Sequence, residues 1–226
     1  RIAHPEDLVF DAGSAGAKSA LQNLIATSKD PSATTVKWDG KPAVIFGRDA
    51  QGRFVLTDKS AFSATKYDGM AKSPKQLAQI MSLRKGDRTD LVNMYARIWP
   101  KVEKSLPVDF KGFVQADLLY SQTPPVKDGE YVFTPNTVTY QVPANSELGK
   151  RISKSSVGLA VHTLIPGVGQ PGRPVDNLDL DPRSGVMAFG SKDQGIQTAK
   201  VDPAAFKQAQ AKINKLAAPI DKLFAP

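Results

Sequence analysis

The chain has 226 residues, 41% of them hydrophobic and 23% charged, values typical of a folded protein with a sizeable core. It contains no cysteine and only two histidines, which excludes disulfides, thiolate metal sites and cysteine nucleophiles and disfavours a histidine-built zinc site. The net charge of +8 favours a polyanionic partner such as nucleic acid or nucleotide, although a protein can be this basic without one.

The first half of the chain alternates helical and strand patterns. Apolar residues at helical spacing follow Gly13 and stop before Pro31, which predicts a helix between them. Ser73 followed by Pro74 is typical of a helix start, with a capping side chain and then proline at the first helical position. The predicted elements are the helix ending near residue 29, strands 34–38, 43–46 and 54–57, and helices 74–83 and 89–99.

The second half is dominated by strands. A hairpin is predicted around Pro135 and Asn136, and Asp202 with Pro203 begins a final amphipathic helix. The predicted elements are strands 113–120, 131–133, 137–142, 157–165, 185–189 and 195–200, with a loop over 166–183. The fold class is therefore α+β with antiparallel sheets and flanking helices. We expect one domain over 1–226, with a helical lead-in over 1–33 and a C-terminal helix over 202–226.

The stretch Lys37-Trp38-Asp39-Gly40 ends a β-branched run and is followed by a second predicted strand. Lys37 is either an exposed lysine of an ordinary strand or a nucleophile. A free lysine has a pKa of about 10.4, so it attacks only where desolvation or nearby cations favour the neutral amine. Gly40 allows a sharp backbone turn beneath a bound nucleotide.

This Lys-x-Asp-Gly sequence resembles the first motif of the covalent nucleotidyltransferases, which are DNA ligases, RNA ligases and mRNA capping enzymes. The resemblance implies that the lysine attacks the α-phosphate of ATP, releases pyrophosphate and holds AMP. It makes Lys37 and Asp39 catalytic and places Val36, Trp38, Gly40 and Lys41 beside the nucleotide. Family members often carry arginine where this chain has Pro42, and we expect the adjacent Lys41 to take over part of that role.

Later segments resemble further motifs of the family in the expected order. Lys59, in Thr57-Asp58-Lys59-Ser60, falls where a short basic motif touches nucleotide or nucleic acid, or is simply a solvated lysine. Asp117, in an apolar strand, stands where the family has a glutamate near the ribose or the metal; an acid among apolar residues is costly unless paired or ligating. His162 takes the place of an aromatic residue that stacks on adenine, and Lys200 that of a closing lysine for the α-phosphate. Residues 184–189 have the glycine and apolar run of another motif but not its charged residues.

The resemblance implies an adenylation domain with a nucleotidyltransferase (ATP-grasp-like) fold and no OB domain, using ATP and Mg²⁺. We expect an ATP-dependent polynucleotide ligase that joins 5′-phosphate and 3′-hydroxyl ends of RNA or DNA. The alternatives are a nucleic-acid-binding module that has lost turnover and a capping-type guanylyltransferase. The segment containing Lys37 also resembles proteins of tailed bacteriophages. No apolar run reaches transmembrane length, so we expect the protein in the cytoplasm, or in the host cytoplasm if it is phage-encoded. We also expect a monomer.

Overall fold

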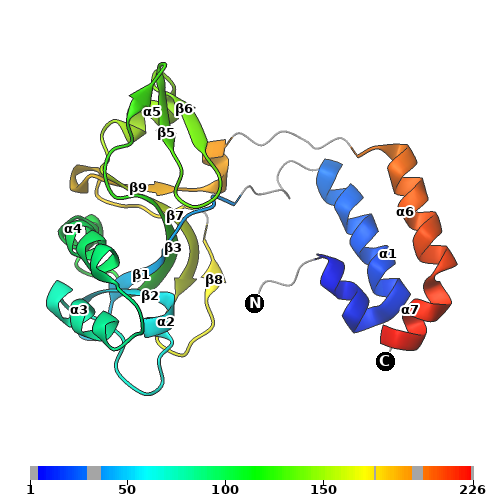
Figure 1. The fold of residues 1–226 in the computed structure, drawn as a ribbon, viewed down its shortest axis with the longest axis horizontal. Helices are drawn as coiled ribbons and strands as arrows, with labels where there is room; N and C mark the ends of the chain where they lie inside the picture. Colours follow the sequence, from blue (N-terminus) through cyan, green and yellow to red (C-terminus); the bar gives the residue numbers. More distant parts are fainter. Residues whose placement is uncertain (1–4, 30–36, 176, 195–200, 225–226) are drawn as a thin grey trace. The chain divides into compact units, whose positions relative to one another are not determined.

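The computed structural model describes residues 5–29, 37–175, 177–194 and 201–224. The chain divides into two compact units, drawn in Figure 1, one of residues 1–36 and 194–226 and the other of residues 37–193. The sequence analysis treated the chain as one domain with helical ends, and those ends form the first unit. The predicted α+β class with mainly antiparallel sheets is confirmed.

The helical unit consists of η1 (Pro5–Asp7), α1 (Leu8–Lys29), α6 (Pro203–Lys215) and α7 (Ala217–Phe224). Helix α1 is kinked at Gly13, whose φ of 57° is left-handed and suits glycine. The backbone N–H and hydroxyl of Ser14 donate to the Asp221 carboxylate at 2.7 and 2.9 Å, so α7 caps the segment of α1 after the kink. The predicted helix start after Gly13 thus corresponds to the second segment of α1.

The single C-terminal helix predicted from the sequence is instead a pair, α6 and α7, separated at Leu216. Pro219 lies in the first turn of α7 and has no N–H to donate to a carbonyl of the preceding turn. A proline in a first turn costs no helical hydrogen bond, whereas in a helix interior it removes one, so a break before Pro219 suits this residue.

The second unit is built on a six-stranded sheet with the order β2-β1-β3-β7-β8, and β9 pairs with β7. Its strands are β1 (Ala43–Arg48), β2 (Phe54–Asp58), β3 (Gly112–Tyr120), β7 (Val157–Ile165), β8 (Arg173–Pro174) and β9 (Val186–Phe189). All pairs are antiparallel except β7 with β9. The loop predicted over 166–183 contains β8 and the first residues of η3 (Pro182–Ser184). The short turn η4 (Ser191–Gln194) ends the described part of this segment.

Helices α3 (Pro74–Ser82) and α4 (Thr89–Ser105) cover one face of this sheet (Figure 1). Alternate residues of the central strands, such as Val114, Ala116 and Leu118, point into the core beneath them. Helix α4 was predicted to end before Pro100 but continues past it, because buried residues of its last turns, including Val102, remain in that core. The short helix α2 (Lys59–Phe62) follows β2.

A small sheet of β4 (Val126–Lys127), β5 (Glu130–Phe133) and β6 (Tyr140–Pro143) is joined to helix α5 (Glu147–Ile152). Strand β6 starts three residues later than predicted, because residues 137–139 belong to the turn. The predicted strand 34–38 lies partly outside the described residues, and its described residues, 37 and 38, are not in a strand.

The opposite face of the large sheet has apolar clusters at its two ends. Phe113 belongs to one cluster and Leu119 to the other, whereas Gln115 and Asp117 lie between them on the same face of β3. This face therefore has a polar centre. Within the described residues, no helix is both long and apolar enough to cross a membrane.

Candidate functional site

Residues 37–42 lie directly beside the end of β3. The N–H of Lys41 donates to the carbonyl of Leu118, and the N–H of Leu118 donates to the carbonyl of Pro42, each at 3.0 Å. A side chain at Gly40 would place its Cβ 2.8 Å from Asp117 Cβ and 2.8 Å from the Leu118 carbonyl oxygen. Glycine is therefore required at residue 40 for this loop to pack against Asp117.

Trp38 anchors the loop in the core. Its side chain is 4% exposed, with ring centroids 4.7 Å from Tyr140 and 4.9 Å from Phe189. The indole N–H donates to the carbonyl of Gly190 at 2.9 Å, so the polar atom of the ring is satisfied. With its ring buried in this way, Trp38 can adjoin a nucleotide only through its backbone.

Asp39 ties the loop to the turn between β5 and β6. Its carboxylate accepts hydrogen bonds from the Asn136 amide at 3.1 Å to both oxygens and from the hydroxyl of Thr137 at 3.0 Å. Its own backbone N–H donates to the Tyr140 hydroxyl at 2.6 Å. The hydrogen bonds from Asn136 and Thr137 lower the pKa of Asp39. These contacts make Asp39 a residue that holds the loop in place.

Lys37, unlike Trp38, points outward and meets Asp117. Its side chain is 72% exposed, and its Nζ lies 3.7 Å from Asp117 Oδ2. The same Oδ2 lies 2.9 Å from His162 Nε2, and the Asp117 side chain is only 12% exposed. A lysine, a nearly buried carboxylate and an imidazole thus meet at the polar centre of the sheet face opposite α3 and α4.

A bulge in β7 brings His162 to Asp117. Gln115 pairs with Thr163 and Ala116 pairs with Val161, so His162 is an extra residue without a partner in β3. Its carbonyl accepts a hydrogen bond at 3.0 Å from the N–H of Val175, the residue that follows β8, and this bond holds the bulge in place. The sequence showed no signal for the bulge, because it depends on pairing between distant strands.

Lys59 follows the last residue of β2. Asp58 pairs with Val44, and the preceding residue of β1, Ala43, pairs with Asp117. Lys59 is exposed and is the first residue of α2, so it lies beyond the paired part of β2. Asp58 itself caps α2 and accepts hydrogen bonds from Arg84 at 2.5 and 2.8 Å. Burial would raise the pKa of Asp58, but the hydrogen bonds outweigh it and the pKa is lowered.

Two expected site residues, Val36 and Lys200, lie outside the described residues. Lys41 is exposed next to Gly40. The sequence analysis missed Asn136, Thr137 and Tyr140 as partners of Asp39. Asn136 was recognised only as part of a turn, because a partner 97 residues away leaves no local pattern.

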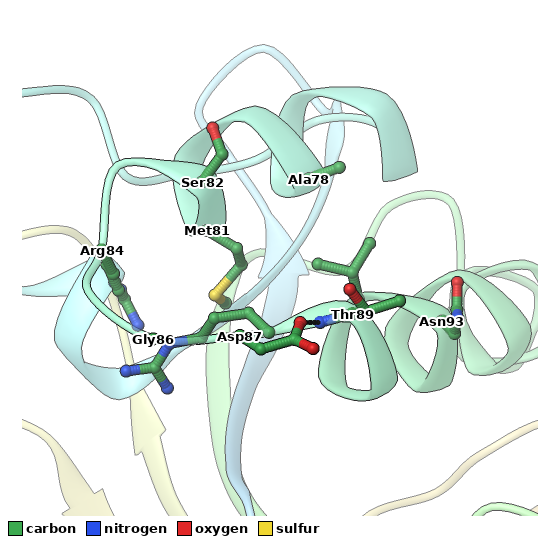
Figure 2. A pocket seen from close by; sticks show the side chains of 10 residues that line it. Ala78, Met81, Ser82, Arg84, Gly86, Asp87, Thr89 and Asn93 are labelled. Carbon is green, nitrogen blue, oxygen red and sulfur yellow. Dashed lines mark hydrogen bonds between the residues drawn. The ribbon is translucent and has the colours of Figure 1, made fainter.

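Two hollows on this unit are lined by other residues than Lys37 and Asp117. The hollow in Figure 2 has a volume of about 280 Å³ and lies between α3 and α4, where Arg84 pairs with Asp58 and Asp87 accepts the N–H of Thr89. The other, of about 790 Å³, lies at the turn joining β1 to β2. Of the cations that line it, Arg53 and Lys72 are paired with neighbouring carboxylates, at 2.8 and 2.7 Å, whereas Arg48 donates to backbone carbonyls. The hydrogen bond at the first hollow thus helps to start α4, and ion pairs offset part of the charge lining the second.

No curated protein and no solved structure matches the chain. A family model matches residues 1–224, which span both units. The protein therefore belongs to the family of unknown function DUF6267.

Proposed function

We propose that this protein is an ATP-dependent nucleotidyltransferase that forms a covalent AMP adduct on Lys37 and acts as a polynucleotide ligase. The observation that carries the proposal is the meeting of Lys37 and Asp117, 3.7 Å apart, at the polar centre of the sheet face opposite α3 and α4. Gly40 supports it, because its lack of a side chain lets the loop pack against Asp117.

The reaction assigned to Lys37 is a displacement at phosphorus. Because Lys37 is exposed and lies beside a carboxylate, we assign the nearby cations that its neutral amine needs to bound Mg²⁺ and the neighbouring lysines. The unprotonated amine forms an N–P bond to the α-phosphate of ATP, the bond to pyrophosphate breaks, and the amine proton passes to solvent. The adenylyl group then passes to a 5′-phosphate, and attack by a 3′-hydroxyl releases AMP. We assign to the exposed lysines Lys41 and Lys59 the stabilisation of negative charge on the phosphates.

Asp117 fits the role expected of it for Mg²⁺. Magnesium is commonly held by one or two carboxylates together with substrate phosphates and water, so a single aspartate is sufficient from the protein. Within the described part of the chain, no hydrogen bond reaches Oδ1 of Asp117, while Oδ2 meets Lys37 and His162. Bound Mg²⁺ would neutralise charge on the phosphates.

The alternative is a nucleic-acid-binding module without turnover. It is favoured by residues 184–189, where the resemblance implies a glutamate before the glycine and a lysine after the apolar run. The chain has Ser184 before Gly185, and the apolar run forms the buried strand β9 without either charged residue. The net charge of +8 suits a nucleic acid under both hypotheses.

Covalent labelling tests the proposal. Wild-type protein incubated with ATP and Mg²⁺ should gain the mass of one AMP, and Lys37→Ala should gain none, because the N–P bond requires that nitrogen. The adduct should survive alkali and be lost in acid. Since Lys37 is 72% exposed, its replacement should cost less than about 1 kcal/mol of unfolding free energy.

Lys75→Ala, which changes another exposed lysine in the first turn of α3, is the matched control and should label like wild type. A labelled Lys37→Ala protein would move the nucleophile to Lys41 or Lys59. Wild-type protein that gains no adduct with ATP, GTP or another divalent metal would support the binding module instead.

A further inference from the structure

His162 is placed to act on Asp117 rather than on a base. The resemblance to nucleotidyltransferases implies a stacking role, in which the face of the ring lies against adenine. In the structure the edge of the ring meets Asp117, with Nε2 buried and 2.9 Å from Oδ2. The side chain as a whole is 19% exposed.

The contact is close, but it is not an aligned hydrogen bond. Nε2 of His162 has no well-aligned acceptor among the described residues, although the distance to Oδ2 is that of a hydrogen bond. At 2.9 Å the two atoms are close enough to form a hydrogen bond once the ring and the carboxylate align. A buried ring nitrogen without a partner costs free energy, and the Asp117 carboxylate is within reach to satisfy it.

The backbone commits His162 to this orientation. The bulge inserts the residue opposite β3, and the hydrogen bond from Val175 to its carbonyl holds the bulge in place. A bulge redirects a side chain that regular alternation would otherwise send elsewhere. The resulting contact restrains the short side chain of Asp117. Its Oδ2 meets His162, and its Oδ1 is left for a ligand.

We propose that His162 is a positioning residue, which holds Asp117 in the orientation that nucleotide transfer at Lys37 requires. This inference rests on the proposed function and adds to it a residue that acts through another. Partners that orient a metal-binding group typically contribute about 10- to 100-fold to metal affinity or activity.

Three substitutions separate positioning from stacking. His162→Gln keeps a donor nitrogen at nearly the distance of Nε2, His162→Phe keeps the ring but no donor, and His162→Ala keeps neither. We expect His162→Gln to form lysyl-AMP at nearly the wild-type rate. His162→Phe and His162→Ala should lose roughly 10- to 100-fold in rate at saturating ATP, with little change in the ATP concentration that gives half the maximal rate.

A stacking role predicts the reverse order. His162→Phe would then react like wild type, whereas His162→Gln and His162→Ala would need more ATP. That result would overturn the inference while leaving the proposed function intact. Unfolding curves of all three variants show whether a slow variant is simply misfolded.

A second measurement does not depend on turnover. The chain has only two histidines, so ¹⁵N resonances of the His162 ring can be assigned by their loss in His162→Gln. The Nε2 resonance of His162 should shift in Asp117→Asn. An unchanged Nε2 resonance would contradict the pairing. If wild-type protein forms no adduct, the proposed function fails, and this measurement still decides whether His162 orients Asp117.

Discussion

Gly40 shows how one residue links the loop to the site. Its position leaves no space for a side chain, because a Cβ would approach Asp117 Cβ and the Leu118 carbonyl oxygen to 2.8 Å. The Leu118 carbonyl accepts the hydrogen bond from the Lys41 N–H that joins the loop to β3, so this carbonyl cannot move without breaking that bond. The glycine is thus needed for packing, in addition to the turn expected from the sequence.

Gly40→Ala should therefore destabilise the protein by about 1–3 kcal/mol, which is typical of an added carbon in a well-packed site. It should also slow AMP transfer, because Asp117 or the loop carrying Lys37 must shift. Urea unfolding and the labelling rate measure the two effects. Gly167→Ala is the control, since a Cβ there meets only the flexible side chain of Gln170, at 3.3 Å. Equal stability of the two variants would contradict the close approach at Gly40.

At the scale of elements, the turn between β5 and β6 holds the loop of residues 37–42. Asn136 and Thr137 supply hydrogen bonds to Asp39, and Tyr140 accepts its N–H. The small sheet is thereby coupled to the site through Asp39. Trp38 anchors the same loop in the apolar cluster that contains Phe189. Displacement of this turn should move Lys37.

The lowered pKa of Asp39 predicts a pH dependence of stability. A carboxyl group whose pKa is lower in the folded state stabilises the protein above its unfolded pKa of about 3.9. That stabilisation is lost as the pH falls through the lower folded pKa. Asp39→Asn should be less stable than wild type at neutral pH, and the difference should shrink in acid.

Urea unfolding from pH 7 down to pH 2.5 measures this difference. Asp87→Asn is a suitable comparison, because the pKa of Asp87 is also lowered, by hydrogen bonds from Thr89 outside this loop. Asp87→Asn should leave AMP transfer unchanged, whereas Asp39→Asn should slow it. A constant stability difference across this pH range for Asp39→Asn would mean that the carboxylate is not engaged as described.

At the scale of the whole molecule, the two units differ in how much apolar surface they bury. Every residue of the three apolar clusters lies within residues 37–193. The buried residues in the described helices of the other unit are Gly13, Ser14 and Gly16, which are small. Hydrophobic burial is the main stabilising contribution to folding, so the helical unit should be much the less stable of the two.

We therefore expect two unfolding transitions, with helices α1, α6 and α7 opening first. Hydrogen exchange should show faster exchange in these helices than in β1, β3 and β7. A fragment of residues 37–193 should fold alone and unfold near the temperature of the second transition. A single transition in the whole chain, or an unfolded fragment, would contradict the division into units.

The elements that local pattern controls were predicted well. Strand 157–165 agrees with β7, and helix 74–83 agrees with α3 to within one residue, because its cap and proline are local signals. The errors arose where distant contacts prevail. Helix α4 passes Pro100 because its last turns are buried, and Thr137 leaves the predicted strand because it binds Asp39.

The sequence by itself determined the α+β class, the longer helices and strands between residues 43 and 189 and the candidate residues Lys37, Asp39 and Asp117. These follow from periodicity, turn residues and short motifs, all of which act over a few neighbouring residues. Only the tertiary structure decided that Asp39 binds the turn, that Trp38 is buried, and that His162 meets Asp117. Strand register and one bulge bring these groups together, and both are set by the packing of residues far apart in the chain.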